Sequence, residues 1–124
     1  MASVLMVNLA PEKKTFLKVL SLRLDFACLE VHPADQFSLI SDLLSGKQQK
    51  QQHGKTFRDE MLIMDGFSRE DLNFLLNEMI RTGHTIQLKA VTTPTNIQWS
   101  PALLHIHLLA ENEQMKKFCP EASV

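Results

Sequence analysis

Polar side chains that could bind or transfer a chemical group stand where the apolar segments of the chain end. Asn8 and Asp65 each close such a segment, and Thr93, Asn96 and Trp99 surround the chain reversal "TTPTNIQW". A carboxylate can hold a metal ion, whereas hydroxyls, amides and an indole ring suit a planar or peptide ligand. We therefore expect these five residues to form a ligand-binding site.

The motifs of common enzyme classes are missing from the sequence. It has neither Gly-x-Gly-x-x-Gly nor a Gly-Lys-Ser/Thr loop, so we predict no nucleotide cofactor. His105 and His107 are two residues apart on a predicted helix, whereas a helical metal pair needs a spacing of four. We expect one exposed and one half-buried histidine, no bound metal and no catalytic residue, which favours a protein that is not an enzyme.

Two interpretations of Asp65 stay open. A metal-dependent or receiver-like phosphoacceptor centre needs several converging carboxylates, and no second carboxylate adjoins Asp65 in the sequence. In the simpler interpretation, Asp65 lies in a turn and its charge favours the N-terminus of the next helix.

The reversal around Asn96 also has two interpretations. Pro94 ends a strand because it lacks an amide proton, and Asn96 can form the turn with its side chain. Trp99 precedes the helix cap Ser100 and stands at staple spacing from Leu104. A structural role therefore explains most of the motif, while a binding role would use its polar groups beside the indole ring.

The elements that must position these residues follow from hydrophobic periodicity. We predict strands at residues 3–9, 26–33, 60–67 and 85–93, and helices at 11–24, 35–46, 68–82 and 100–117. The chain is then one α/β domain over residues 1–124, made of β-α-β-α halves at 3–46 and 60–117. Right-handed crossovers imply a four-stranded, mainly parallel sheet in the order 2-1-3-4, with helices on both faces. The ends of strands one and three would then share one ligand crevice.

Several finer predictions concern helix faces and caps. Asp35 is predicted to cap the second helix and Gly46 to end it. Shifting the second half back by 56 residues aligns the two longer helical stripes, which we list in order. They are Leu72, Leu75, Leu76, Met79 and Ile80 against Phe16, Val19, Leu20, Arg23 and Leu24.

The polar segment at residues 47–59 contains four glutamines and little to bury. We expect an exposed linker there, with a basic recognition loop as the alternative. The tail at residues 118–124 is expected to be frayed.

The amino-acid composition limits which classes of partner we expect. Thirteen basic and fourteen acidic residues give a net charge of -1, so we expect no nucleic-acid partner. No apolar run is long enough to span a membrane, and Cys28 and Cys119 are expected to be free thiols in a reducing cytoplasm.

From about Met61 to Glu113, the chain resembles an uncharacterised bacterial family, domain of unknown function 3783. The likeness rests on "DGFS", then on "LKAVTTPTNIQWS", and on a helix carrying "LLAENE" with Glu111 and Glu113. The resemblance implies a bacterial cytoplasmic protein and supplies no activity.

We therefore expect a small non-enzymatic binding or regulatory module with a protein or small-molecule partner. The alternatives are the centre at Asp65 and a protein-interaction subunit that uses the apolar segment "ALLHIHLLA" of the last helix. Formation of a homodimer stays open.

Overall fold

The computed structural model describes residues 2–46 and 56–118. The strands are β1 (Ala2–Val7), β2 (Phe26–Val31), β3 (Met61–Asp65) and β4 (Leu88–Val91). The helices are α1 (Pro11–Leu24), α2 (Ile40–Leu44), α3 (Arg69–Arg81) and α4 (Pro101–Phe118), with 3₁₀ turns η1 (Pro33–Asp35) and η2 (Asn96–Gln98). None of the helices in these two ranges has the length and apolarity needed to cross a bilayer.

All four strands form a single sheet in the order β2-β1-β3-β4, which confirms the predicted order and the α/β class. The outer pairs β1–β2 and β3–β4 are parallel, as predicted within each half. The central pair β1–β3 is antiparallel, with Ser3 opposite Asp65 and Val7 opposite Met61. The sheet as a whole is therefore mixed, and the two halves run in opposite directions.

Backbone turns occupy matching places in the two halves. Asn8 after β1 has a φ of 58°, and Gly66 after β3 has a φ of 76°. Asp25 at the end of α1 and Gly83 at the end of α3 likewise have positive φ values. Asparagine and aspartate tolerate this left-handed region better than most residues other than glycine. Both pairs are 58 residues apart, which differs by two from the predicted shift of 56.

One buried position of the two helices follows the same shift of 58 residues. Leu17 and Leu75, which are 58 residues apart, are both fully buried. Val19 and Ile80 belong to the predicted stripes but are 59% and 69% exposed, so their assignment to the core is wrong.

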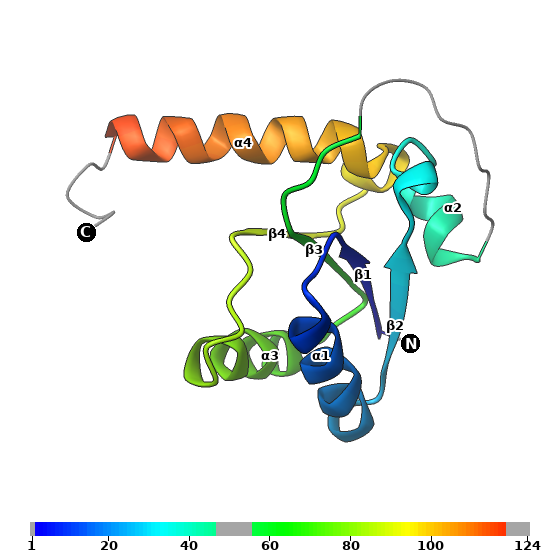
Figure 1. Ribbon diagram of the computed structural model, residues 1–124, viewed down its shortest axis with the longest axis vertical. Helices are drawn as coiled ribbons and strands as arrows, with labels where there is room; N and C mark the ends of the chain where they lie inside the picture. Colours follow the sequence, from blue (N-terminus) through cyan, green and yellow to red (C-terminus); the bar gives the residue numbers. More distant parts are fainter. Residues whose placement is uncertain (1, 47–55, 119–124) are drawn as a thin grey trace.

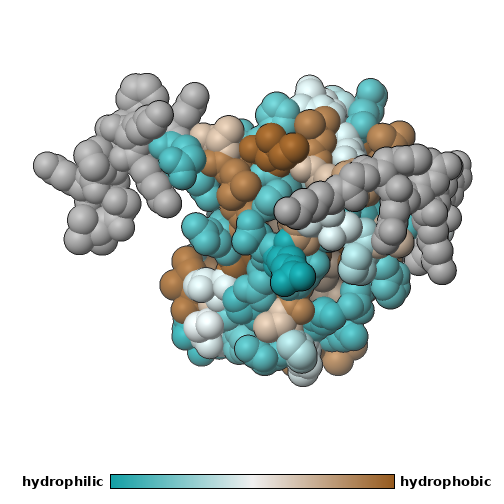
Figure 2. Space-filling view, turned by 45° about the horizontal axis from the view of Figure 1, so that its top comes forward, coloured by the Kyte–Doolittle hydropathy of each residue, from teal (hydrophilic) through white to brown (hydrophobic). Residues whose placement is uncertain are grey.

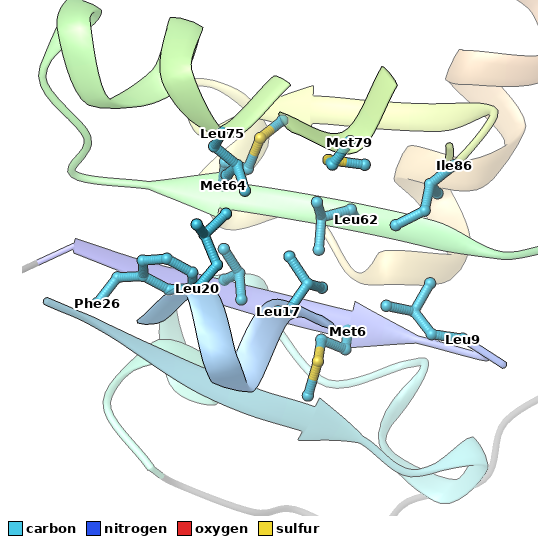
Figure 3. Close-up of a cluster of buried hydrophobic side chains, with 11 residues drawn as sticks. Met6, Leu9, Leu17, Leu20, Phe26, Leu62, Met64, Leu75, Met79 and Ile86 are labelled. Carbon is cyan, nitrogen blue, oxygen red and sulfur yellow. The ribbon is translucent and has the colours of Figure 1, made fainter. Parts of the chain in front are cut away.

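Two apolar layers cover the sheet. In Figure 3, Leu17 and Leu20 of α1 and Leu75 and Met79 of α3 pack on one face of the strands. On the opposite face, Ile40 and Leu43 of α2 and Leu104 of α4 form the second layer with residues of β1, β3 and β4. Figure 1 shows α1 and α3 on one side and α2 and α4 on the other. Helices therefore lie on both faces, as predicted.

The second predicted helix is shorter than the sequence indicates. Asp35 does not cap it, because this residue ends η1 and is only 2% exposed. The helix α2 begins at Ile40, whose N–H donates to the carbonyl of Trp99 (2.8 Å) and not to a capping side chain. A contact from a distant turn thus replaces the local cap. Gly46 follows α2 with a φ of 81°, as predicted.

Gln36 is fully buried and joins segments that are far apart in sequence. Its Oε1 accepts the Phe57 N–H (3.0 Å), and its Nε2 donates to the Phe57 carbonyl (3.2 Å) and to Oδ1 of Asn8 (3.4 Å). Its own carbonyl accepts the N–H of Ala102 in the first turn of α4 (2.9 Å). Asn8 Nδ2 also donates to the carbonyls of Phe57 (2.9 Å) and Asp59 (3.2 Å).

These bonds correct the predicted linker at residues 47–59. Residues 47–55 lie outside the described residues, whereas Phe57 and Asp59 are fixed by the side chains of Gln36 and Asn8. The ring of Phe57 is half-buried and stacks on His105 of α4 at a centroid distance of 4.0 Å. The segment that leads into β3 is therefore part of the packed structure.

Replacing Gln36 tests this role. Gln36→Leu keeps most of the volume but leaves the buried Phe57 N–H bond without its acceptor and removes one of the two donors to the Phe57 carbonyl, so we expect the free energy of unfolding to fall by about 2 kcal/mol. Urea denaturation measures this change. Gln98→Leu, at an exposed glutamine of η2, is the matched control and should change stability by less than about 0.5 kcal/mol. Equal effects of the two variants would contradict the role of Gln36.

Candidate functional site

The five predicted site residues lie at two ends of the sheet. Asp65, Thr93, Asn96 and Trp99 come from the carboxyl ends of β3 and β4 or from the turn that follows β4. Asn8 lies at the opposite end, because β1 runs antiparallel to β3. The expectation of one crevice shared by Asn8 and Asp65 is therefore wrong. The side chain of Asn8 holds the backbone before β3 in place.

The side chain of Asn96 builds the turn after β4. Its Oδ1 accepts the Thr93 N–H (2.8 Å), while its own N–H donates to Oγ1 of Thr93 (3.0 Å). Its Nδ2 donates to the carbonyl of Val91 (3.1 Å), and the residue is buried. Because these bonds satisfy backbone groups of the turn, Asn96 acts first as a structural residue. Thr93 itself is exposed.

Trp99 connects this turn to α4. Ser100 caps the helix, since its Oγ accepts the Leu103 N–H (3.2 Å), as predicted. Trp99 packs against the core layer that contains Leu104, which is the partner expected for a hydrophobic staple. Its indole ring also stacks on His107, with centroids 4.3 Å apart. Part of the half-buried indole therefore packs on the core layer, and part of it stays accessible.

A groove of about 340 Å³ lies between β4 and α4. Thr93, Asn96 and Trp99 line it from the turn, and His107 and Glu111 line it from the exposed side of α4. The strand contributes Lys89, Ala90 and Val91, and the helix adds Leu104 and Leu108. Apolar walls with a few polar groups at the mouth are typical of ligand-binding grooves. Burial lowers the pKa of Lys89, whose ammonium donates to the Ile86 carbonyl (2.5 Å).

The groove runs along β4, the outer strand of the sheet, which pairs with β3 alone within residues 2–46 and 56–118. The Thr92 N–H donates to the Met64 carbonyl of β3 (3.0 Å). Backbone groups alternate in direction along a strand, so the N–H groups of Lys89 and Val91 point away from β3. The outward carbonyl of Val91 already accepts the Asn96 amide. The strand thus presents outward backbone donors beside the groove.

Asp65 pairs with the neighbouring strand end. Its Oδ1 accepts the hydroxyl proton of Thr92 (2.5 Å). Within residues 2–46 and 56–118, no group of three or more His, Cys, Asp or Glu side chains is placed to hold a metal ion. Asp65 is also absent from the residues that line the groove. Of the five predicted residues, the structure brings Thr93, Asn96 and Trp99 together around the groove.

Glu60 fixes the opposite end of the sheet, beside Asn8. Its carboxylate accepts the Ala10 N–H (2.8 Å) and the ammonium of Lys13 (2.5 Å). Partial burial raises the pKa of Glu60, but these two donors lower it by more, so the pKa lies below the ordinary 4.5. Asp59 pairs with His105, its Oδ2 lying 2.9 Å from Nε2. Side-chain pairs at this end therefore fix the start of β3.

The groove also contains residues that were not among the predicted contacts. Leu104, His107, Leu108 and Glu111 are spaced by three or four positions, which places them on one stripe of α4. This spacing is visible in the sequence and could have identified His107 once the helix was aligned beside β4. As expected, His105 is half-buried and His107 is exposed. On the outer side of α4, Leu103, Ile106 and Leu109 are exposed, and Figure 2 shows this apolar surface.

These features describe an α/β domain with a mixed sheet and a groove between an edge strand and the last helix. The family model described as "Domain of unknown function (DUF3783)" matches residues 60–115, which confirms the resemblance predicted for residues 61–113. No curated protein and no solved structure matches the chain. Every residue that lines the groove falls inside the matched segment.

The turn around Asn96 gives a direct stability prediction. Asn96→Ala leaves the Thr93 N–H and the Val91 carbonyl without their partners, so we expect the free energy of unfolding to fall by about 2 kcal/mol. Thermal unfolding measures the loss. Asn77→Ala replaces an exposed asparagine of α3 and serves as the matched control, for which we expect little change. If Asn96→Ala melts at the wild-type temperature, the fold does not need this side chain.

The low pKa of Glu60 predicts acid sensitivity. A carboxylate whose pKa is lower in the folded state adds stability above its unfolded pKa, and this contribution is lost as the pH falls through the folded value. We therefore expect stability to decrease as the pH falls below about 4.5, and to decrease less in Glu60→Gln. Urea denaturation between pH 6 and 3 measures both slopes. Glu12→Gln, at an exposed position of α1, should keep the wild-type slope. Parallel curves for wild type and Glu60→Gln would contradict the prediction.

Proposed function

We propose that the protein is a non-enzymatic binding module that takes up an extended peptide segment beside β4. The observation that carries this proposal is the continuity of the groove with the open edge of that strand. A peptide strand could pair with the outward N–H groups of Lys89 and Val91 and place a side chain in the groove. Backbone pairing of this kind supplies affinity, and the neighbouring pocket selects side chains.

The lining of the groove indicates which peptide side chain fits. Trp99, Leu104 and Leu108 offer an indole ring and two aliphatic side chains. An apolar side chain of the peptide would contact these walls, because burying apolar surface is favourable. Lys89 and Glu111 lie at the same groove with opposite charges, so they favour polar or zwitterionic flanking residues over a strongly charged segment. We place this activity in the bacterial cytoplasm that the family resemblance implies.

The proposal is tested with peptides selected from a random decapeptide display library on the full chain. Binding is followed by fluorescence of Trp99, the single tryptophan of the chain. Val91→Pro removes the outward N–H without removing a bond to β3, so we expect at least tenfold weaker binding. Ile106→Ala on the outer side of α4 is the control and should bind as wild type does.

Three results would overturn the proposal. They are the absence of any selected binder, unchanged Trp99 fluorescence on binding, and equal affinity of wild type and Val91→Pro. Circular dichroism of Val91→Pro first establishes that the variant is folded. Sedimentation at several protein concentrations shows whether a second copy of the chain already occupies the edge of β4, which would replace the peptide partner by a homodimer.

A further inference from the structure

A second pocket, of about 180 Å³, lies beside the other edge strand of the sheet, on the side covered by α2. Its walls include the aliphatic side chains of Leu5, Leu29, Val31 and Leu43, which belong to the core layer on that side or pack against it. Glu30 also borders the pocket, but its carboxylate pairs with Lys14 of α1. Asp35, which is only 2% exposed, also lines the pocket.

Asp35 occupies the place in the first half that Asn96 occupies in the second. The Asp35 carbonyl accepts the N–H of Ser38 (3.0 Å), as the Asn96 carbonyl accepts the N–H of Trp99 (2.9 Å). Each lies eight residues before a buried leucine, which is Leu43 in the first half and Leu104 in the second. The N–H of that leucine donates to the carbonyl four residues earlier in both helices. The two residues therefore share a position relative to the following helix, although Asp35 ends η1 and Asn96 begins η2.

The side chains of Asp35 and Asn96 differ in their hydrogen-bonding capacity. The amide of Asn96 donates to one backbone group and accepts from another. A carboxylate can only accept, so Asp35 cannot copy the donation to a carbonyl. Oδ1 of Asp35 is buried and has no hydrogen-bond partner, although the residue is only 2% exposed. A buried carboxylate oxygen without a partner is costly.

We propose that this pocket binds an alkylammonium group, with Asp35 as the counter-ion and the four aliphatic side chains around its methylene stem. The pocket is too small for a drug-sized ligand but has room for a stem of a few carbon atoms. A cationic head group would place a positive charge beside Asp35, and an apolar stem matches the walls. The site lies outside the β4–α4 groove and does not depend on the peptide-binding proposal.

The probe is n-butylammonium, and 1-butanol of similar size and shape is the neutral control ligand. Both are titrated at pH 7 into the isotopically labelled full chain, and amide chemical shifts are recorded by NMR. We expect butylammonium to shift the amides of Asp35, Leu43 and Gly46 and to bind at least tenfold more tightly than butanol. Equal affinities, or shifts confined to other parts of the chain, would overturn the proposal.

Asp35→Asn separates binding from folding. An uncharged amide costs less to bury than a carboxylate, so we expect the melting temperature of the free protein to rise by roughly 4 °C. Butylammonium should bind this variant at least tenfold more weakly. Glu12→Gln removes one exposed negative charge outside the pocket and should bind as wild type does. A lower melting temperature of Asp35→Asn, or unchanged affinity, would overturn the role of Asp35.

A blocked lysine, Nα-acetyl-lysine methylamide, distinguishes the two sources of such a group. Tighter binding of the blocked lysine than of butylammonium identifies a lysine side chain of a polypeptide as the natural occupant. Tighter binding of butylammonium identifies a free alkylamine. Either result supports the cation site, and binding of neither compound overturns it.

Discussion

The antiparallel pairing of β1 with β3 determines the layout of the whole molecule. It turns the two β-α-β-α halves in opposite directions, so the carboxyl ends of β1 and β3 point to opposite ends of the sheet. A parallel sheet would have gathered these ends in one crevice at a topological switch point. Here each half instead builds its own Pro-containing turn and its own pocket beside an edge strand, on the side covered by α2 and α4. Two separate small sites therefore replace one central site.

The turns after β2 and β4 carry different side chains at corresponding positions. In the second half, the side chain of Asn96 satisfies the backbone around it, and the chemistry of the groove is left to Trp99, His107 and the strand edge. In the first half, Asp35 fills the same position and leaves a carboxylate oxygen unpaired. The two halves thus differ in whether the side chain of the turn satisfies the polar groups around it. Residues of binding sites often lower the stability of the fold.

Much of the fold could be predicted from local patterns. Hydrophobic periodicity predicts the strands. Capping patterns predict the caps at Ser68 and Ser100 and the glycine at the end of α3, because these signals act over a few residues. The direction of β3 against β1 was not readable, since local residue patterns do not set whether two distant strands run parallel. The role of Gln36 was hidden for a similar reason, because its partners lie 21 and 28 residues away. Of the predicted contacts, Thr93 and Trp99 line the groove, whereas Asn8 lies at the other end of the sheet.

The central pairing also has a consequence for the order of folding during synthesis. Val4–Val7 is buried in the finished sheet, yet its antiparallel partner, Met61–Met64, is made more than 50 residues later. Until that partner leaves the ribosome, β1 can pair with β2 but keeps an apolar edge open. Contacts between such distant segments slow folding, and an unpaired strand edge invites association with other chains. The first half therefore stays an incomplete sheet until β3 has been made. The bonds that Gln36 and Asn8 make to Phe57 then hold the segment that leads into β3.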